Sequence, residues 1–266
     1  MPLHALPLLA AAASVLVAAP VSAANKADAQ AAAAALVPSG TLRAGINLGN
    51  SVLAQRDASG ELGGASVVLA KALAERLGVK VQLIPYNEAG ETFAAGLKGE
   101  WDVAFLAVDP KRAEQIDYSA PYVIIEGTYV VRKDSPFHAA ADLDREGVRI
   151  SVAKGAAYTM FLSRTLKHAQ LVELPDGDAS IAAFEAQNLD AAASVAQALA
   201  PIVKAHPEWR MISPGFQTIG QAVALPKGRP PEAVAYLNRF LDEMKASGVL
   251  RQALDQTGQA AATIAP

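Results

Sequence analysis

The sequence predicts an α/β protein made of two lobes, each with its own sheet flanked by helices. With 266 residues, of which 52% are hydrophobic, the chain can bury one large core or two modest ones. The predicted elements alternate between strand and helix from residue 41 to 108, and again from 148 to 205. Such alternation is typical of parallel strands joined by right-handed crossovers.

The stretch from residue 103 to 122 is the centre of the first alternation. Its first six residues are apolar without a break, which is typical of a strand covered on both faces, and Asp109-Pro110 then opens a helical turn. Ligands of open α/β sheets bind beyond the carboxyl ends of the strands, where helix amides favour an anion. Arg112 lies at this junction, and its guanidinium can bind a carboxylate through two hydrogen bonds. The alternative is an ordinary ion pair with a nearby acid, such as Asp117, on a solvated turn.

The first 23 residues have the features of a secretory signal peptide. They contain no Asp, Glu, Lys or Arg and end in Val-Ser-Ala, a small-residue cleavage pattern. A membrane anchor is the alternative, although the apolar run over 8–19 is shorter than the roughly 20 residues of a spanning helix. The chain has no cysteine, which excludes disulfides, thiolate sites and a lipid-modified cysteine. We therefore expect a free periplasmic protein, with a flexible lead-in over 24–39.

Several function classes are excluded or disfavoured. A net charge of -3 and the lack of a basic run give no basis for nucleic-acid binding. No metal-ligand spacing, nucleophile elbow or phosphate loop is present. His138, His168 and His206 are predicted in loops or at helix ends, away from the strand ends. We therefore predict no catalytic residue, metal or cofactor. We also predict a monomer.

The first half begins with a strand over 41–46, and Asn47 and Asn50 lie in the loop that follows its carboxyl end. Both are candidates for ligand contact, and ordinary turn chemistry is the alternative. A helix over 66–77, a strand over 79–85 and a helix over 91–98 lead to the central strand. Tyr86 follows the second strand and could flank a ligand, although packing is the alternative.

The second half repeats the alternation. The expected strands cover 128–132, 148–153, 170–174, 190–194 and 220–226. The expected helices cover 156–168, 179–187, 196–205, 231–246 and 250–256. The last strand mirrors the one over 129–132, and two helices close the chain.

Seven segments in this order resemble the extracellular solute-binding proteins, family 3, of polar amino-acid ABC transporters. They cover residues 40–47, 69–85, 101–105, 110–122, 129–136, 148–158 and 222–228. The resemblance implies a type II periplasmic binding protein, a Venus-flytrap fold with a mixed sheet flanked by helices in each lobe. Two hinge strands, near 122–127 and 217–222, join the lobes. The implied boundaries are 40–124 and 221–258 for a discontinuous lobe 1, 125–220 for lobe 2, and 259–266 for a C-terminal tail.

The resemblance also implies that Arg112 binds a ligand carboxylate. The sequence departs from the family where hydroxyl residues usually precede that arginine, because Phe105 and Ala107 stand there. It departs again directly after residues 190–193 of the expected strand, where Ser194-Val195 replaces an acid that usually neutralises the ligand's ammonium group. An unpaired buried ammonium costs several kcal/mol.

These departures predict a carboxylate ligand with a less polar body. The candidate contacts are Phe105, Ala107, Ala157, Tyr158 and Ser194. The alternative is that Glu126 or Asp109 supplies the missing negative charge.

The resemblance implies binding by lobe closure, which is driven by contacts that only the closed state makes. The closed protein would deliver its small carboxylate ligand to an ABC transporter permease. Two alternatives stay open: a periplasmic enzyme of the cyclohexadienyl dehydratase type on the same fold, and a protein that delivers its ligand to a sensor or assists an oxidoreductase.

Overall fold

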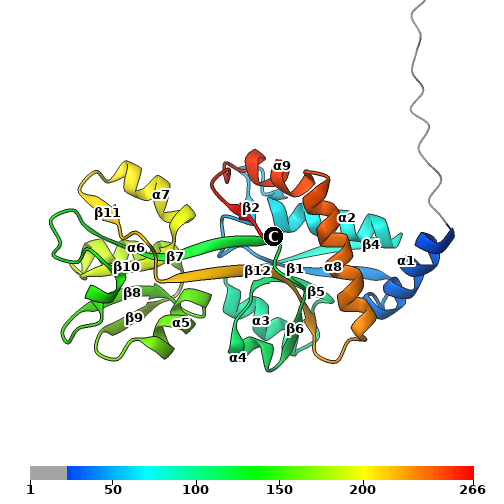
Figure 1. The fold of residues 1–266 in the computed structure, drawn as a ribbon, viewed down its shortest axis with the longest axis horizontal. Coiled ribbons are helices and arrows are strands. Elements are labelled where there is room, and N and C mark those ends of the chain that lie inside the picture. Colours follow the sequence, from blue (N-terminus) through cyan, green and yellow to red (C-terminus); the bar gives the residue numbers. More distant parts are fainter. Residues whose placement is uncertain (1–22) are drawn as a thin grey trace, which may run out of the picture.

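The computed structural model describes residues 23–266, which form two α/β lobes joined by two long strands (Figure 1). The main strands are β1 Thr41–Asn47, β4 Lys80–Tyr86, β5 Val103–Ala107, β6 Ile116–Tyr118, β7 Val123–Arg132, β8 Arg149–Ala153, β9 Gln170–Leu174, β10 Ala191–Val195, β11 Trp209–Met211 and β12 Gln217–Pro226. The α-helices are α1 Ala23–Leu36, α2 Ala65–Leu77, α3 Ala89–Leu97, α4 Pro110–Ala113, α5 Ala157–Thr165, α6 Gly177–Ala186, α7 Ala196–Ala205, α8 Pro231–Ala246 and α9 Val249–Gln256.

The main sheet is continuous through both lobes, in the order β4-β1-β5-β12-β7-β10-β8-β9. We expected a separate sheet in each lobe. The difference arises because β7 and β12 each have ten residues and pair with each other at the crossing, from Gln217 opposite Gly127 to Gln221 opposite Val123. Beyond it, β7 pairs with β10 and β11, and β12 pairs with β5 and β6. The crossing lies where the hinge strands were expected.

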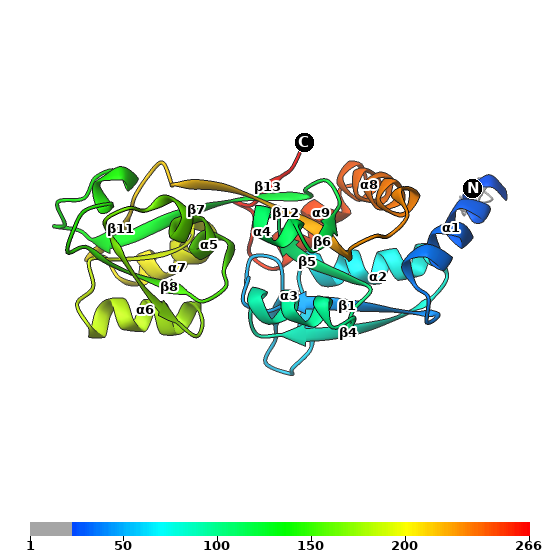
Figure 2. The same cartoon turned by 90° about the horizontal axis from the view of Figure 1, so that it is seen from below.

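The sheet is mixed in each lobe, as the resemblance implies. In lobe 1, β1 is parallel to β4 and to β5, and the returning β12 is antiparallel to β5. In lobe 2, β8 is parallel to β9 and to β10, and β10 is antiparallel to β7. The carboxyl ends of the parallel strands therefore face each other across the space between the lobes (Figure 2).

Helix α2 illustrates how the sequence pattern builds lobe 1. Leu69, Leu73 and Leu77 recur at helical spacing and are buried. Gly78 then ends the helix in the left-handed conformation, with φ of 69°, and its N–H donates to Glu75 O. The helix and its glycine cap agree with the prediction over 66–77.

The segment expected as a flexible lead-in, 24–39, is largely helical in the structure. Helix α1 contacts α2 and α8, and Leu36 is fully buried there. The spacing of Ala32 and Leu36 places both on the face that packs against the lobe. The predicted signal peptide falls on residues 1–23 and so lies almost wholly outside the described residues.

Short elements escaped prediction. The hairpin β2 Gln55–Arg56 and β3 Leu62–Gly63 has two residues in each strand, and β6 and β11 have three. So few residues carry no measurable periodicity. The C-terminal tail also forms a strand, β13 Thr263–Ile264, which pairs with β7 at the crossing.

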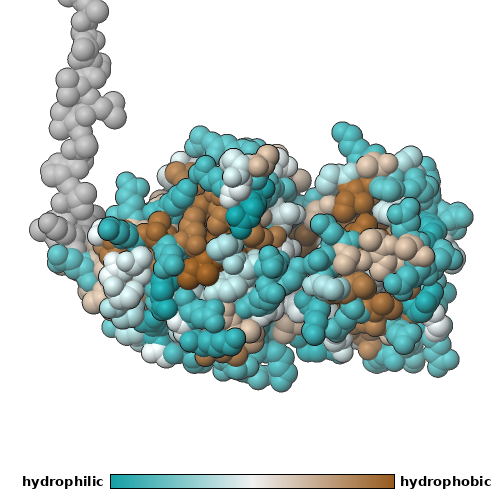
Figure 3. Space-filling view, turned by 180° about the vertical axis from the view of Figure 1, so that it is seen from behind, coloured by the Kyte–Doolittle hydropathy of each residue, from teal (hydrophilic) through white to brown (hydrophobic). Residues whose placement is uncertain are grey.

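The surface view from behind shows two masses with hydrophilic side chains over much of this face and apolar patches on both (Figure 3). Among residues 23–266, no helix is long and apolar enough to cross a membrane.

Candidate ligand-binding cleft

A cavity of about 400 Å³ lies between the lobes, at the carboxyl ends of the parallel strands. Its polar lining comes from both lobes: Asn47, Asn50, Asn87, Glu88, Arg112, Tyr158, Asp176, Asp178, Ser194 and Gln221. Its apolar lining includes Ala107, Ala153, Ala157, Val195 and Ile219. The volume lies in the range of small-molecule sites.

Arg112 is held by the helical turn α4. Asp109 caps that turn, because its Oδ1 accepts hydrogen bonds from the backbone N–H of Lys111 at 2.9 Å and of Arg112 at 3.3 Å. The Arg112 side chain is buried and lines the cavity, and its Nη2 donates to Gly155 O in lobe 2 at 2.6 Å. Its Nη1 has no hydrogen-bond partner among residues 23–266. Burial lowers the pKa of Arg112, and the nearby Asp109 partly offsets this effect. A guanidinium stays charged in proteins, and among residues 23–266 no carboxylate forms an ion pair with this one.

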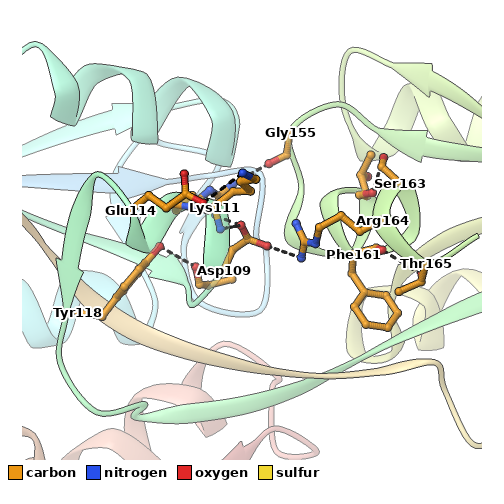
Figure 4. Close-up of polar contacts among 12 residues, drawn as sticks. Asp109, Lys111, Glu114, Tyr118, Gly155, Phe161, Ser163, Arg164 and Thr165 are labelled. Carbon is orange, nitrogen blue, oxygen red and sulfur yellow. Dashed lines mark hydrogen bonds and ion pairs between the residues drawn. The ribbon is translucent and has the colours of Figure 1, made fainter.

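A second contact crosses the cleft beside Arg112. Arg164 Nη2, on α5, lies 2.8 Å from Asp109 Oδ2, and the two side chains point toward each other from opposite lobes (Figure 4). The lobes are therefore in contact, and Asp109 is engaged by its helix turn and by Arg164. It is not free to neutralise a ligand ammonium.

Asn47 and Asn50 line the cavity, and both also organise the loop after β1. Asn47 Oδ1 accepts a hydrogen bond from Gly49 N at 3.0 Å, and Asn50 Oδ1 accepts one from Val52 N at 3.3 Å. Asn47 and Asn50 therefore stabilise the turn and line the cavity at the same time.

Tyr158 and Ser194 form part of the lobe 2 wall, as the sequence suggested. Burial raises the pKa of the Tyr158 phenol to about 12, so its hydroxyl stays protonated and can donate a hydrogen bond. Ala107 is also in the lining, at the end of β5.

Two candidate residues are not in the cavity lining. The Tyr86 hydroxyl donates to Glu100 Oε2 at 3.3 Å, and its ring packs beside the cluster around Trp101, because the side chain leaves β4 on the face that α3 covers. Phe105 is buried one pleat deeper in β5 than Ala107 and packs edge-on against Tyr122, with ring centroids 6.1 Å apart. Contact of Tyr86 and Phe105 with a ligand stays a prediction, and neither side chain lines this cavity.

The cavity contains three carboxylates that the sequence analysis missed: Glu88, Asp176 and Asp178. Glu88 directly precedes α3, but its side chain makes no capping hydrogen bond and lies against Gly49 instead. Burial, followed by repulsion from Asp176, Glu91 and Asp178, raises the pKa of Glu88 to about 7. This acidic lining differs from the less polar surroundings that the substitutions predicted.

Neither of the two residues suggested as a source of negative charge, Glu126 and Asp109, lines the cavity. Glu126 Oε1 accepts a hydrogen bond from Gly215 N at 2.5 Å and is not in the lining, and Asp109 is engaged as described above. Gln221, on β12, also lines the cavity and was not a candidate. Among the described residues, no group of three or more His, Asp or Glu side chains is placed to hold a metal ion.

The sequence profile of the bacterial extracellular solute-binding proteins, family 3, matches residues 42–259, most of the chain and both lobes. The chain belongs to this family. The match confirms the family and the fold that the resemblance implied.

Individual relatives that align over most of this chain share only about a quarter of its residues. A cyclohexadienyl dehydratase of Pseudomonas aeruginosa is 25% identical over 232 residues, which cover 83% of each chain. An octopine-binding periplasmic protein of Rhizobium meliloti is 39% identical over 79 residues, 29% of this chain and 26% of its own. Among solved structures, an amino acid ABC transporter substrate-binding protein from Streptococcus pneumoniae bound to L-arginine superposes with a TM-score of 0.73 at 23% identity. That alignment covers 85% of this chain and 98% of the other.

Proposed function

We propose that this family member is a periplasmic binding protein that captures an amino acid or a related organic acid and delivers it to an ABC transporter permease. The carboxylate of the ligand binds Arg112, and closure of the lobes encloses the rest of the ligand. The observation that carries this proposal is the unpaired Nη1 of Arg112, a buried donor on a residue that lines the cavity between the two lobes.

The energetics favour an anion at this place. A buried charged donor without a partner costs more than an ordinary unmade hydrogen bond, so a carboxylate that pairs with it gains affinity. The guanidinium already bridges the cleft through Gly155 O. A ligand that pairs with Nη1 would therefore interact at the point where the lobes meet, which is where a contact favours closure.

The names of relatives support the same function. The S. pneumoniae protein is described as a substrate-binding protein of an amino acid ABC transporter, and the R. meliloti protein as octopine-binding and periplasmic. A solute-binding role outside the cytoplasm also agrees with the expected signal peptide.

A thermal-shift screen of amino acids and organic acids against the wild type and Arg112→Met tests the proposal. Methionine keeps the length and apolar stem of the side chain but removes the charge. A ligand at a hundred times its Kd adds roughly 2.7 kcal/mol of stability, which the wild type should show and the variant should lose.

Arg132→Met is a matched control. Arg132 donates to Leu189 O and Phe184 O within lobe 2 and is not in the cavity lining, so its loss should reduce stability without abolishing ligand shifts. The same carboxylate hits in Arg112→Met as in the wild type would refute Arg112 as the anchor.

A second candidate function is a dehydratase, and Glu88 is the observation that favours it. A carboxyl group with a pKa of about 7, in the same cavity as Arg112, has the properties of a general acid. The P. aeruginosa relative is named a cyclohexadienyl dehydratase. A cyclohexadienol carboxylate that loses water, with the second leaving group being a ring proton or the carboxylate as CO2, forms an aromatic ring, so turnover would appear as new ultraviolet absorbance. Turnover that disappears in Glu88→Gln would favour the enzyme, and binding without turnover would favour the transport protein.

A further inference from the structure

We propose that the ligand carries, besides the carboxylate that binds Arg112, a separate cationic group that binds between Glu88 of lobe 1 and Asp176 and Asp178 of lobe 2. This inference deepens the proposed function and rests on it. It concerns the opposite end of the ligand from the one that Arg112 holds.

The first argument is the charge of the cavity. Among the described residues that line it, the acids are Glu88, Asp176 and Asp178, and Arg112 is the one base. A ligand with only a carboxylate would satisfy Arg112 and leave the acids unpaired in a partly desolvated space. A ligand that also carries a cation neutralises both ends.

The second argument is the position of the acids in the sheet. Glu88 follows β4, the edge strand of lobe 1, and Asp176 follows β9, the edge strand of lobe 2. Arg112 follows β5, which is separated from β4 by β1. Two strand spacings put the ends of β4 and β5 roughly 10 Å apart, and Arg112 is not among the charged groups that shift the pKa of Glu88. We therefore expect an extended ligand whose two charges are separated.

The third argument is that the Glu88 carboxylate has no hydrogen-bond or ion-pair partner among residues 23–266, and only its carbonyl bonds to α3 through Thr92. Its side chain makes no capping bond to α3, and it lies near other acids rather than near a base. Asp176 differs, because its Oδ1 caps α6 by accepting from Ala179 N at 2.7 Å. Asp176 therefore has a structural role as well, and its other oxygen is the one available to a ligand.

The unpaired Nη1 of Arg112 is the independent sign that this cavity receives a charged ligand. This atom is buried and has no partner among residues 23–266, and its residue lines the same cavity as the acids. A site with an unpaired cation at one end and repelling carboxylates at the other is complementary to a dipolar molecule.

Four probes isolate the cationic group: L-lysine, L-norleucine, 6-aminohexanoate and hexanoate. All have the same carbon chain and carboxylate, and they differ only in the presence of the α-amino and the terminal amino groups. We expect the terminal amino group to tighten binding about tenfold or more, both from norleucine to lysine and from hexanoate to 6-aminohexanoate, as for hydrogen bonds between charged groups. Lysine that binds no tighter than norleucine, or no binding of any probe, would overturn the proposal.

Variants of the acids give the complementary test. Glu88→Gln and Asp176→Asn should weaken lysine about tenfold and leave norleucine unchanged, and asparagine keeps the cap of α6. Glu75→Gln is the control, because Glu75 is exposed on α2 of the same lobe, does not line the cavity and is not among the groups that raise the pKa of Glu88. Equal losses for lysine and norleucine in Glu88→Gln would contradict the proposal.

Proton release provides a readout that a merely structural role would not change. The groups that raise the pKa of Glu88 are Asp176, Glu91 and Asp178, and Tyr158 faces it from α5. A ligand cation beside Glu88 would lower that pKa, so lysine should release protons at pH 7 and norleucine should not. Calorimetry in phosphate and in Tris measures this difference, and it should vanish in Glu88→Gln.

The two proposals fail in different ways. If Arg112→Met binds all probes as the wild type does, the carboxylate anchor is wrong. If Arg112→Met loses all probes but the wild type binds lysine and norleucine equally, the anchor stands and the cationic end is wrong.

Discussion

Arg164 Nη2 and Asp109 Oδ2 lie 2.8 Å apart and form an ion pair that joins the two lobes across the ligand cleft (Figure 4). Asp109 is buried, and its other oxygen caps the turn that carries Arg112. Asp109, which positions the proposed carboxylate anchor Arg112, therefore also contacts the opposite lobe. The Asp109 side chain therefore links the contact between the lobes to the position of Arg112.

Arg164→Ala should open the protein and weaken ligand binding. The pair forms only when the lobes meet, so its loss lowers the population of the closed state. For one partly exposed ion pair we expect about 1 kcal/mol, or about fivefold in Kd, and a larger radius of gyration without ligand by X-ray scattering. Arg145→Ala is the control, because Arg145 pairs with Asp142 within lobe 2. Unchanged dimensions and affinity in Arg164→Ala would show that the pair does not hold the lobes together.

Gly155→Ala should hinder closure through a backbone contact. A Cβ at Gly155 would lie 3.2 Å from the Cα of Gly90 in the other lobe, and the residue has φ of +71°. The left-handed conformation costs an alanine about 1 to 2 kcal/mol. Gly147→Ala, with φ of +82° and no atom within 4 Å of the added Cβ, should lose similar stability by chemical denaturation. Only Gly155→Ala should also lose affinity, and an equal loss in both variants would attribute the effect to backbone strain alone.

The sequence was sufficient for the parts of the site that depend on local pattern. The uninterrupted apolar run and the Asp109-Pro110 break locate a strand end and a helix start, and that junction places Arg112 in the cleft. It was not sufficient for Glu88, whose surroundings depend on Asp176, a residue 88 positions later that only lobe closure brings near it.

Tyr86 and Phe105 do not line the cavity, and the reason again lies in the tertiary structure. Tyr86 ends a strand as Asn47 does, but it lies in the outermost strand, and α3 covers the face from which its side chain leaves. Phe105 and Ala107 share a face of β5, and only the last of the two reaches the cavity. The order of the strands in the sheet keeps Tyr86 out of the cavity, and the distance from the strand end keeps Phe105 out. Neither can be read from the local sequence.

Gly96→Ala should destabilise lobe 1 without touching the cleft. An added Cβ would lie 2.1 Å from Cζ2 of Trp101, whose ring is fully buried and whose Nε1 donates to Thr92 O at 2.7 Å. The indole is fixed and cannot give way, so we expect a loss of about 1 to 3 kcal/mol in the free energy of unfolding. Gly90→Ala, on the same helix, has its nearest contact at an ordinary 3.6 Å and should lose little or gain slightly from helix propensity. A Gly96→Ala variant as stable as the wild type would mean that the indole moves.

Glu88 should make the ligand-free protein less stable as pH rises from about 4.5 to about 7. Its pKa is about 7 in the folded protein and 4.5 in a free side chain, so within this window the folded state binds more protons than the unfolded state. Stability that is present below pH 4.5 is therefore lost as the pH approaches 7 and stays lost above it. Glu88→Gln removes this dependence, so the variant should melt at a higher temperature than the wild type at pH 8, and the difference should shrink toward pH 5. Glu75→Gln, at an exposed position of α2, should show no such pH-dependent gain. A constant difference between Glu88→Gln and the wild type across this range would mean that Glu88 is ionised throughout, and that the acids of the two lobes do not meet in solution.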